Sequence, residues 1–447
     1  LLRGALWGLI YPMLETLQPS SGGYLEATPL TSFVTMALAS SGDKNHPCVP
    51  AAVEFLLRSE REDGSWPIDT NLATWGTTLA VKALLGGEQE NEQEQEQERA
   101  ALRTELRPVR EWLLEQQYHE VHPFTNAAPG GWAWTDLPGG VPDADDTSGA
   151  LVALAYLCET EGDRLAALPA AEAGITWLLD LQNRDGGMPT FCRGWGTLPF
   201  DRSTPEITAH ALRGWSAWEP WVNEALRERM KSAKARALRY LSKMLQRVWK
   251  GGTGYVSPYG DQTMIKAKQR LRLGPFAWWQ PLWFGNEHTT VENNPVFGTA
   301  LVMMGLLHAQ KESVPNGATA ADASQTSSHV TMARHIIWLV EQQGAHGGWG
   351  GDKDIMPSVE ETAMVVHVLS LALHAEEMPL DGEQKVVVRR AVERGVQWLL
   401  MKTENGTLFL PAPIGLYFAR LWYHEMIYPV VWTLGALRAA REALARG

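Results

Sequence analysis

Three carboxylates lie within four residues in the segment 143–147, which reads DADDT and directly precedes the apolar run 150–155. Helix capping accounts for two of them, because Asp143 follows a proline and is a good N-cap, and Asp146 three positions later completes a capping pattern. Asp145 has no such role. Neighbouring carboxylates raise one another's pKa, so one of the three is expected to keep its proton. Beside aromatic surface, such a group is a proton donor. Capping and acid chemistry both remain open on the motif alone.

The bulk composition is that of an ordinary folded protein of 447 residues, 45% hydrophobic and 20% charged. A net charge of −12 argues against general nucleic-acid binding, which needs a basic face. The cysteines Cys48, Cys158 and Cys192 show neither metal-type spacing nor a disulfide framework, which favours the cytoplasm. No apolar run approaches the roughly 20 residues of a membrane span. The chain begins without Met and without a convincing signal peptide, so we expect the numbering to start inside a longer product.

One unit recurs along the chain: an apolar segment ending in a Trp-Leu-Leu-type run, a turn with Gly and often Trp, and a second apolar helix. Such turns hold many of the 20 tryptophans, several times common usage. The clearest copies start near positions 53, 111, 176 and 337, weaker ones near 240 and 397, and a first pair covers 6–41. The helical spacing of apolar residues predicts about seven helix pairs and no series of strands. Because an α/α toroid closes with six pairs, we expect an all-α, single α/α barrel plus one extra pair. An open α-solenoid with a binding surface is the alternative.

Three segments interrupt the repeats within what we expect to be a single domain over 1–447. Residues 88–99 are acidic and of low complexity, typical of a solvated linker or a frayed helix start. Residues 311–328 are polar and are expected to form a surface loop. Residues 249–285 are rich in Gly, Pro and aromatic residues and carry five basic side chains. This third segment is either a loop with a solvated basic edge or a lid that meets an anionic head group or a membrane surface.

The glycine-tryptophan turns resemble the QW motifs of the class II terpene cyclases, the squalene-hopene and oxidosqualene cyclase group. Residues 343–349 (QGAHGGW) are nearly a complete QW motif, whereas 182–188 ends in Met where the Trp would stand. DADDT at 143–147 resembles the DxDDT proton-donor motif of that family. The segment 205–210 (PEITAH) resembles the one whose histidine hydrogen-bonds the donor. The resemblance covers roughly residues 45–441, and the combination of DxDDT with a later Thr-Ala-His is specific.

By this resemblance Asp145 is the acid, Asp143 and Asp146 hold it, and His210, as an imidazolium, bonds the oxygen that lacks the proton. Taken alone, a histidine on an apolar helix face is more often a satisfied core residue. The implied reaction protonates a terminal alkene or epoxide of a linear polyprenyl compound and starts a carbocation cascade that ends by deprotonation or water capture. No cofactor is implied, because the acid comes from the protein, and the Asp-Asp-x-x-Asp metal motif of class I enzymes is absent.

A carbocation needs a dry cavity without nucleophiles, and desolvated aromatic faces stabilise it by up to about 2 kcal/mol each. For most tryptophans, packing between repeats is the better interpretation. The positions that match the family's cavity aromatics, the last three in a region of uncertain register, are Trp75, Trp134, Phe191, Trp283, Tyr417, Trp422 and Tyr423.

The chain also departs from the squalene-hopene cyclases. The family's Arg-Trp after Gly285 is replaced by Asn286-Glu287, and the chain has material for one barrel rather than two. A smaller barrel favours an isoprenoid substrate shorter than squalene, as in single-domain meroterpenoid (merosterolic-acid-type) cyclases, and the basic segment 249–285 suits an acidic head group. Peripheral contact with a membrane is compatible with a lipid substrate. The alternatives are a squalene/hopene-type triterpene cyclase, a prenyltransferase β-subunit holding zinc through Cys192 and His210, and a non-catalytic toroid that binds lipid or protein.

Overall fold

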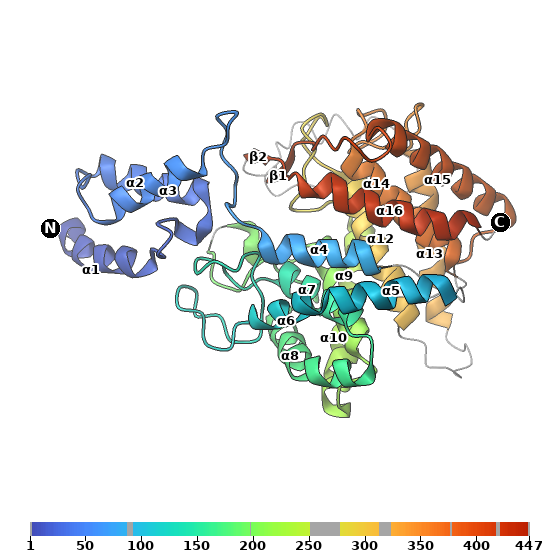
Figure 1. Cartoon of the computed structure of the whole chain (residues 1–447), viewed down its shortest axis with the longest axis horizontal. Helices are drawn as coiled ribbons and strands as arrows, with labels where there is room; N and C mark the ends of the chain where they lie inside the picture. Colours follow the sequence, from blue (N-terminus) through green and yellow to red (C-terminus); the bar gives the residue numbers. More distant parts are fainter. Residues whose placement is uncertain are drawn as a thin grey trace.

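The computed structural model describes residues 2–86, 93–196, 198–250, 278–312, 323–375, 378–416 and 421–445. Over these ranges the regular secondary structure is almost all helical, and irregular segments connect the helices (Figure 1). The one sheet within them pairs β1 (Ile414–Leu416) antiparallel with β2 (Leu421–Tyr423), with Gly415 opposite Trp422. None of the described helices combines the length and the apolar content needed to cross a bilayer.

Six helices form a closed inner ring in the described part of the chain. Each contacts the next in chain order, and the last packs against the first. Their facing side chains form one continuous hydrophobic core. The ring consists of α4 (Ala73–Leu85), α7 (Ala144–Leu157), α9 (Pro205–Trp218), α12 (Pro295–Glu312), α14 (Val359–His374) and α16 (Ile427–Ala445). This closure confirms the predicted all-α, α/α-barrel fold and excludes the open solenoid.

The outer helices return the chain from the end of one inner helix to the start of the next, so the inner helices all run in the same direction. Two of them, α5 and α6, follow one another with a single residue between. The outer layer consists of α5 (Gln93–Glu105), α6 (Arg107–Glu115), α8 (Glu161–Leu181), α10 (Glu224–Lys250), α13 (Ala323–Glu341) and α15 (Gly382–Lys402).

A glutamine at the end of an outer helix joins that helix to the next outer helix. Gln182 after α8 shows the pattern: its Nε2 donates to the carbonyl oxygen of Gly186 in its own turn at 2.9 Å and to that of Ala233 on α10 at 3.0 Å. Gln117 and Gln343 make the same pair of bonds after α6 and α13. The recurring Gln and Gly of the sequence repeat are therefore a structural joint between neighbouring repeats.

The first three helices, α1 (Leu2–Leu17), α2 (Thr28–Ser40) and α3 (Cys48–Ser59), pack with one another apart from the ring (Figure 1). They have a small core of their own around Tyr24 and Leu38. Gln18 repeats the glutamine joint, donating to the carbonyl oxygens of Gly22 and Cys48. In the described residues three helices therefore lie outside the ring, where the sequence predicted one extra pair, and twelve helices build the toroid. Two short 3₁₀ helices, η1 (Tyr24–Glu26) and η2 (Pro199–Asp201), lie between the α-helices.

The predicted interruptions are more helical than expected where the structure describes them. Residues 93–99 of the acidic segment begin α5, because glutamate and glutamine are good helix formers even without apolar periodicity. Residues 323–328 of the expected polar loop begin α13, and 311–312 end α12. The remaining parts, 88–92 and 313–322, lie outside the described residues, as do 251–277 of the basic segment.

Candidate active site

The acidic motif forms the start of α7. Asp143 is the N-cap, with an extended backbone, and its Oδ1 accepts a hydrogen bond of 2.7 Å from the backbone N–H of Asp146. The prediction of Asp143 as N-cap is thereby confirmed, but Asp146 contributes only its backbone N–H, because the N–H of Asp143 donates to the carbonyl oxygen of Trp132. Asp145 takes no part in the cap. Its Oδ1 instead lies 2.6 Å from Nδ1 of His210 on α9.

The second ring nitrogen of His210 faces a lysine. Its Nε2 lies 3.4 Å from Nζ of Lys82 on α4. Burial, followed by the nearby charge of Lys82, lowers the pKa of His210 to about 4, against the raising effect of Asp145. The lowered pKa favours a neutral ring at pH 7, whereas the resemblance implied an imidazolium. When Nζ of Lys82 donates to Nε2, the ring proton resides on Nδ1, which donates to Asp145.

Other carboxyl groups around the pair retain protons near neutral pH. Burial raises the pKa of Asp143 and raises that of Asp146 to about 7. Burial also raises the pKa of Glu206 to about 7, and its Oε1 accepts a hydrogen bond of 2.7 Å from the backbone N–H of Leu282. Sequence reasoning did not single out Glu206. The available signal was its spacing, because a residue four positions before His210 lies on the same helix face.

A central cavity of about 110 Å³ lies inside the ring, and side chains from all six inner helices line it. Of the residues predicted for the site, Asp145, His210, Trp75 and Trp283 are on its wall. The indole N–H of Trp75 donates to the hydroxyl of Tyr428 at 2.8 Å, which fixes its ring.

The other predicted aromatics lie away from this wall or cannot be placed. Phe191 has its ring centroid 5.8 Å from those of both Trp134 and Trp283, so Phe191 and Trp134 form a layer behind Trp283. Trp422 and Tyr423 are on β2 and are not part of the cavity wall. Tyr417 lies outside the described residues.

Three aromatic side chains on the wall were not predicted: Phe284, Phe297 and Trp432. The rings of Phe297 and Trp432 are 5.4 Å apart, and those of Phe284 and Phe297 are 4.7 Å apart. Trp432 could have been found from the repeat, because it belongs to the inner helix of the last copy. Phe284 has no comparable signal, because it lies in an irregular segment.

The zinc alternative required Cys192 and His210 to meet. Cys192 instead lines a surface groove with Thr125 and Trp177, while His210 bonds Asp145 inside the cavity. In the described ranges, no group of three or more His, Cys, Asp or Glu side chains is arranged to hold a metal ion.

Comparison with known proteins gives a consistent set of relatives. The family model of the squalene-hopene cyclase C-terminal domain matches residues 72–272. Enfumafungin synthase of Hormonema carpetanum is 24% identical over 386 residues, covering 80% of this chain and 24% of that protein. A terpene cyclase-glycosyl transferase fusion protein of Humicola fuscoatra is 26% identical over 411 residues, covering 87% and 27%. The chain thus spans about a quarter of the length of these two curated relatives.

Solved structures share the fold at low identity. The type II terpene cyclase MstE from Scytonema, in complex with geranylgeranyl dihydroxybenzoate, matches with a TM-score of 0.50 and 15% identity, over 88% of this chain and 95% of that chain. A possible member of the GH105 family from Klebsiella pneumoniae matches with the same TM-score and identity, over 86% of each chain. These likenesses support the α/α toroid and nothing finer. With the family match they confirm the predicted resemblance: this chain is similar to the squalene-hopene cyclases, most directly to their C-terminal domain over residues 72–272.

Proposed function

We propose that this protein is a class II terpenoid cyclase that protonates a terminal alkene or epoxide of a linear polyprenyl substrate through Asp145. One observation carries the proposal: the 2.6 Å contact between Oδ1 of Asp145 and Nδ1 of His210 on the wall of the central cavity. With Oδ1 engaged by the histidine, Oδ2 is the oxygen that carries the proton toward the substrate.

The surroundings of this pair suit carbocation chemistry. When Asp145 gives up its proton, the N–H of His210 stabilises the carboxylate that forms, because hydrogen bonds to the charged form favour it. The faces of Trp75 and Trp283 line the same space and stabilise the cation without capturing it. Proton loss or capture by water ends the cascade.

The substrate in this proposal is a prenylated compound with an acidic head group. Its support is the single barrel and the fold shared with MstE, whose structure contains geranylgeranyl dihydroxybenzoate. The enzyme would work in the cytoplasm, in peripheral contact with the membrane that supplies a lipid substrate. A squalene/hopene-type triterpene cyclase is the second candidate, favoured by the family match over residues 72–272.

The test is an incubation of the purified protein with squalene, farnesyl and geranylgeranyl diphosphates and prenylated hydroxybenzoates, analysed by mass spectrometry. We expect a cyclic product that is isomeric with one of the acidic substrates or is its hydrate. Asp145→Asn keeps the shape of the side chain, removes the acid and should abolish the product. Asp136→Asn, which changes an exposed carboxylate, should leave the formation of the cyclic product unchanged.

Turnover of squalene alone would favour the triterpene cyclase instead. Turnover that persists in Asp145→Asn would exclude Asp145 as the acid. Ligand binding that is equal in both proteins, without any turnover, would point to a non-catalytic lipid-binding toroid.

A further inference from the structure

The central cavity changes its chemistry along its depth. Because the inner helices run in the same direction, residues in the same turn of each helix lie at a similar level. The first turns contribute the acid and aromatic groups Asp145, Glu206 and Trp75. The third turns contribute basic side chains: Lys82 on α4, Arg213 on α9 and His367 on α14.

Arg213 forms no ion pair with a carboxylate in the described part of the chain. It is only 7% exposed, and its Nη2 donates to the neutral hydroxyl of Tyr156 at 2.9 Å. Within the described residues its Nε has no hydrogen-bond partner, and no carboxylate pairs with the guanidinium. A buried guanidinium stays charged, and burying a charge is costly unless an anion pairs with it.

The pKa values of two basic neighbours respond to the charge of Arg213. Burial, followed by the charge of Arg213, lowers the pKa of Lys82 to about 7 and that of His367 to about 3. The carboxyl groups on the cavity wall, Asp145 and Glu206, belong to first turns, at the other level. The third-turn level therefore has basic groups from three helices and lacks an acidic one among the described lining residues.

We propose that Arg213, together with His367 on α14, forms an anion-binding subsite that takes the acidic head group of the prenyl substrate. This inference rests on the proposed function and names the part of the cavity that would bind the polar end of the substrate. The matching chemistry is a carboxylate or a phosphate, because a guanidinium donates two parallel hydrogen bonds to such groups. Gly435 keeps room for the ligand beside His367, since a Cβ there would lie 3.3 Å from Nδ1 of that ring.

The position of the subsite also determines the orientation in which the substrate would bind. Arg213 is three residues beyond His210 on α9, about 4.5 Å further along the helix axis. His210 contacts Asp145, so the proton donor and the subsite occupy two levels of one cavity. A head group bound at Arg213 would hold the chain with its far alkene toward Asp145.

The experiment measures binding in the Asp145→Asn protein, which cannot consume an alkene by protonation through that residue. The protein is titrated with geranylgeranyl diphosphate, geranylgeranyl dihydroxybenzoate and the uncharged geranylgeraniol, and tryptophan fluorescence detects binding. We expect at least one anionic ligand to bind about tenfold more tightly than the alcohol, and the identity of that ligand distinguishes phosphate from carboxylate. Adding Arg213→Gln should remove this preference and leave the affinity for the alcohol unchanged.

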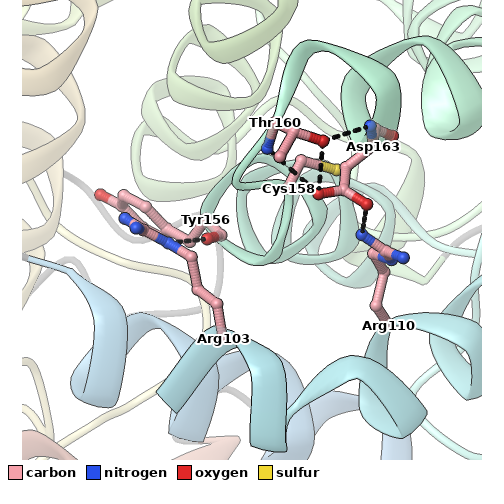
Figure 2. A network of polar contacts seen from close by, with 6 residues as sticks. All are labelled: Arg103, Arg110, Tyr156, Cys158, Thr160 and Asp163. Atoms are coloured by element: carbon pink, nitrogen blue, oxygen red, sulfur yellow. Dashed lines mark hydrogen bonds and ion pairs between the residues drawn. The ribbon is translucent and has the colours of Figure 1, made fainter. Parts of the chain in front are cut away.

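Arg103→Gln is the matched control. Arg103 on α5 also contacts Tyr156, donating from Nε to its backbone oxygen at 3.2 Å (Figure 2). It is not among the residues that line the cavity. Its loss should leave the anion preference intact. Tyr156→Phe removes the hydroxyl that positions Arg213 but keeps the charge of the guanidinium. It should weaken the preference for anionic ligands, and it replaces Arg213→Gln as the test if that variant does not fold.

Two outcomes would overturn the subsite: the alcohol binding as tightly as both anions, or the preference surviving Arg213→Gln. Neither bears on the proposed function, which depends on loss of turnover in Asp145→Asn. Conversely, an anion preference that depends on Arg213 in a protein that cyclises nothing would keep the subsite and reject the cyclase.

Discussion

In the proposed proton donor, Asp145 with His210, Lys82 is the residue that fixes which ring nitrogen of His210 carries the proton. Its Nζ lies 3.4 Å from Nε2 of His210 and 5.2 Å from the centre of the Trp75 ring, so the indole holds the ammonium in place. A donor at Nε2 keeps the ring proton on Nδ1, where it bonds Asp145. Sequence reasoning identified Asp145 and His210 from the motif but not Lys82, because a lysine in an apolar inner helix carries no motif of its own.

Replacing Lys82 should therefore impair the proton donor more than substrate binding. We expect Lys82→Met to lower kcat about tenfold to a hundredfold with little change in KM, because the ring loses its fixed tautomer. Lys82→Arg restores a charged donor and should recover part of the rate. Nitrogen-15 NMR of His210 should show the Nδ1–H tautomer in the native protein and a mixture in Lys82→Met. An unchanged tautomer, or equal losses in both variants, would contradict this role.

At the level of elements, the joints between outer helices are built by glutamines. Gln182 satisfies two carbonyl oxygens, and one of them belongs to Ala233, 51 residues later. The turn packs directly on α10, since a Cβ at Gly186, where φ is +96°, would lie 2.3 Å from the carbonyl oxygen of Arg236. The sequence predicted this turn as a QW-like motif, but it did not predict the partner helix, because such a contact depends on tertiary packing.

The stability of this joint can be measured. Gln182→Ala leaves two carbonyl oxygens without their donor, and we expect it to lower the free energy of unfolding by about 1–3 kcal/mol. Gln397→Ala, which truncates an exposed glutamine on α15, should change it by less than about 0.5 kcal/mol. Denaturant titration compares the two. Equal effects would indicate that the motif glutamine does not join the helices.

At the level of the whole molecule, the repeats predicted a helical barrel but not which helices lie outside the ring. The arrangement depends on contacts between distant residues. Arg99 on α5 reaches Glu442 on α16 with a buried ion pair of 3.0 Å, across 343 positions of sequence, and this contact holds α5 against the ring. No local pattern in the acidic segment before Arg99 indicates that partner. The prediction of cavity aromatics fails for the same reason. Trp134 and Phe191 match positions of the family's cavity aromatics, yet they lie behind Trp283.

The buried carboxyl groups of the toroid make its stability depend on pH. Glu206 is 5% exposed, and burial raises its pKa from 4.5 to about 7. Its contribution to stability is complete below the unfolded pKa and is lost as pH rises through about 7, because the unfolded chain ionises first. The buried His210 and His367, whose pKa values are lowered, act in the opposite direction and lose their contribution as pH falls below about 6.5.

Glu206→Gln isolates one of these groups. Glutamine keeps an oxygen to accept from the N–H of Leu282 and does not ionise. The stability of the variant relative to the native protein should therefore rise between pH 5 and pH 8, by about 2–3 kcal/mol, and then level off. Denaturant unfolding at constant ionic strength measures this difference, and Glu383→Gln, which changes an exposed carboxylate on α15, provides the flat reference. A difference that stays constant over this range would mean that Glu206 ionises in the folded protein as it does in the unfolded chain. The cavity would then be wetter than its lining indicates, and a wet cavity would quench a carbocation.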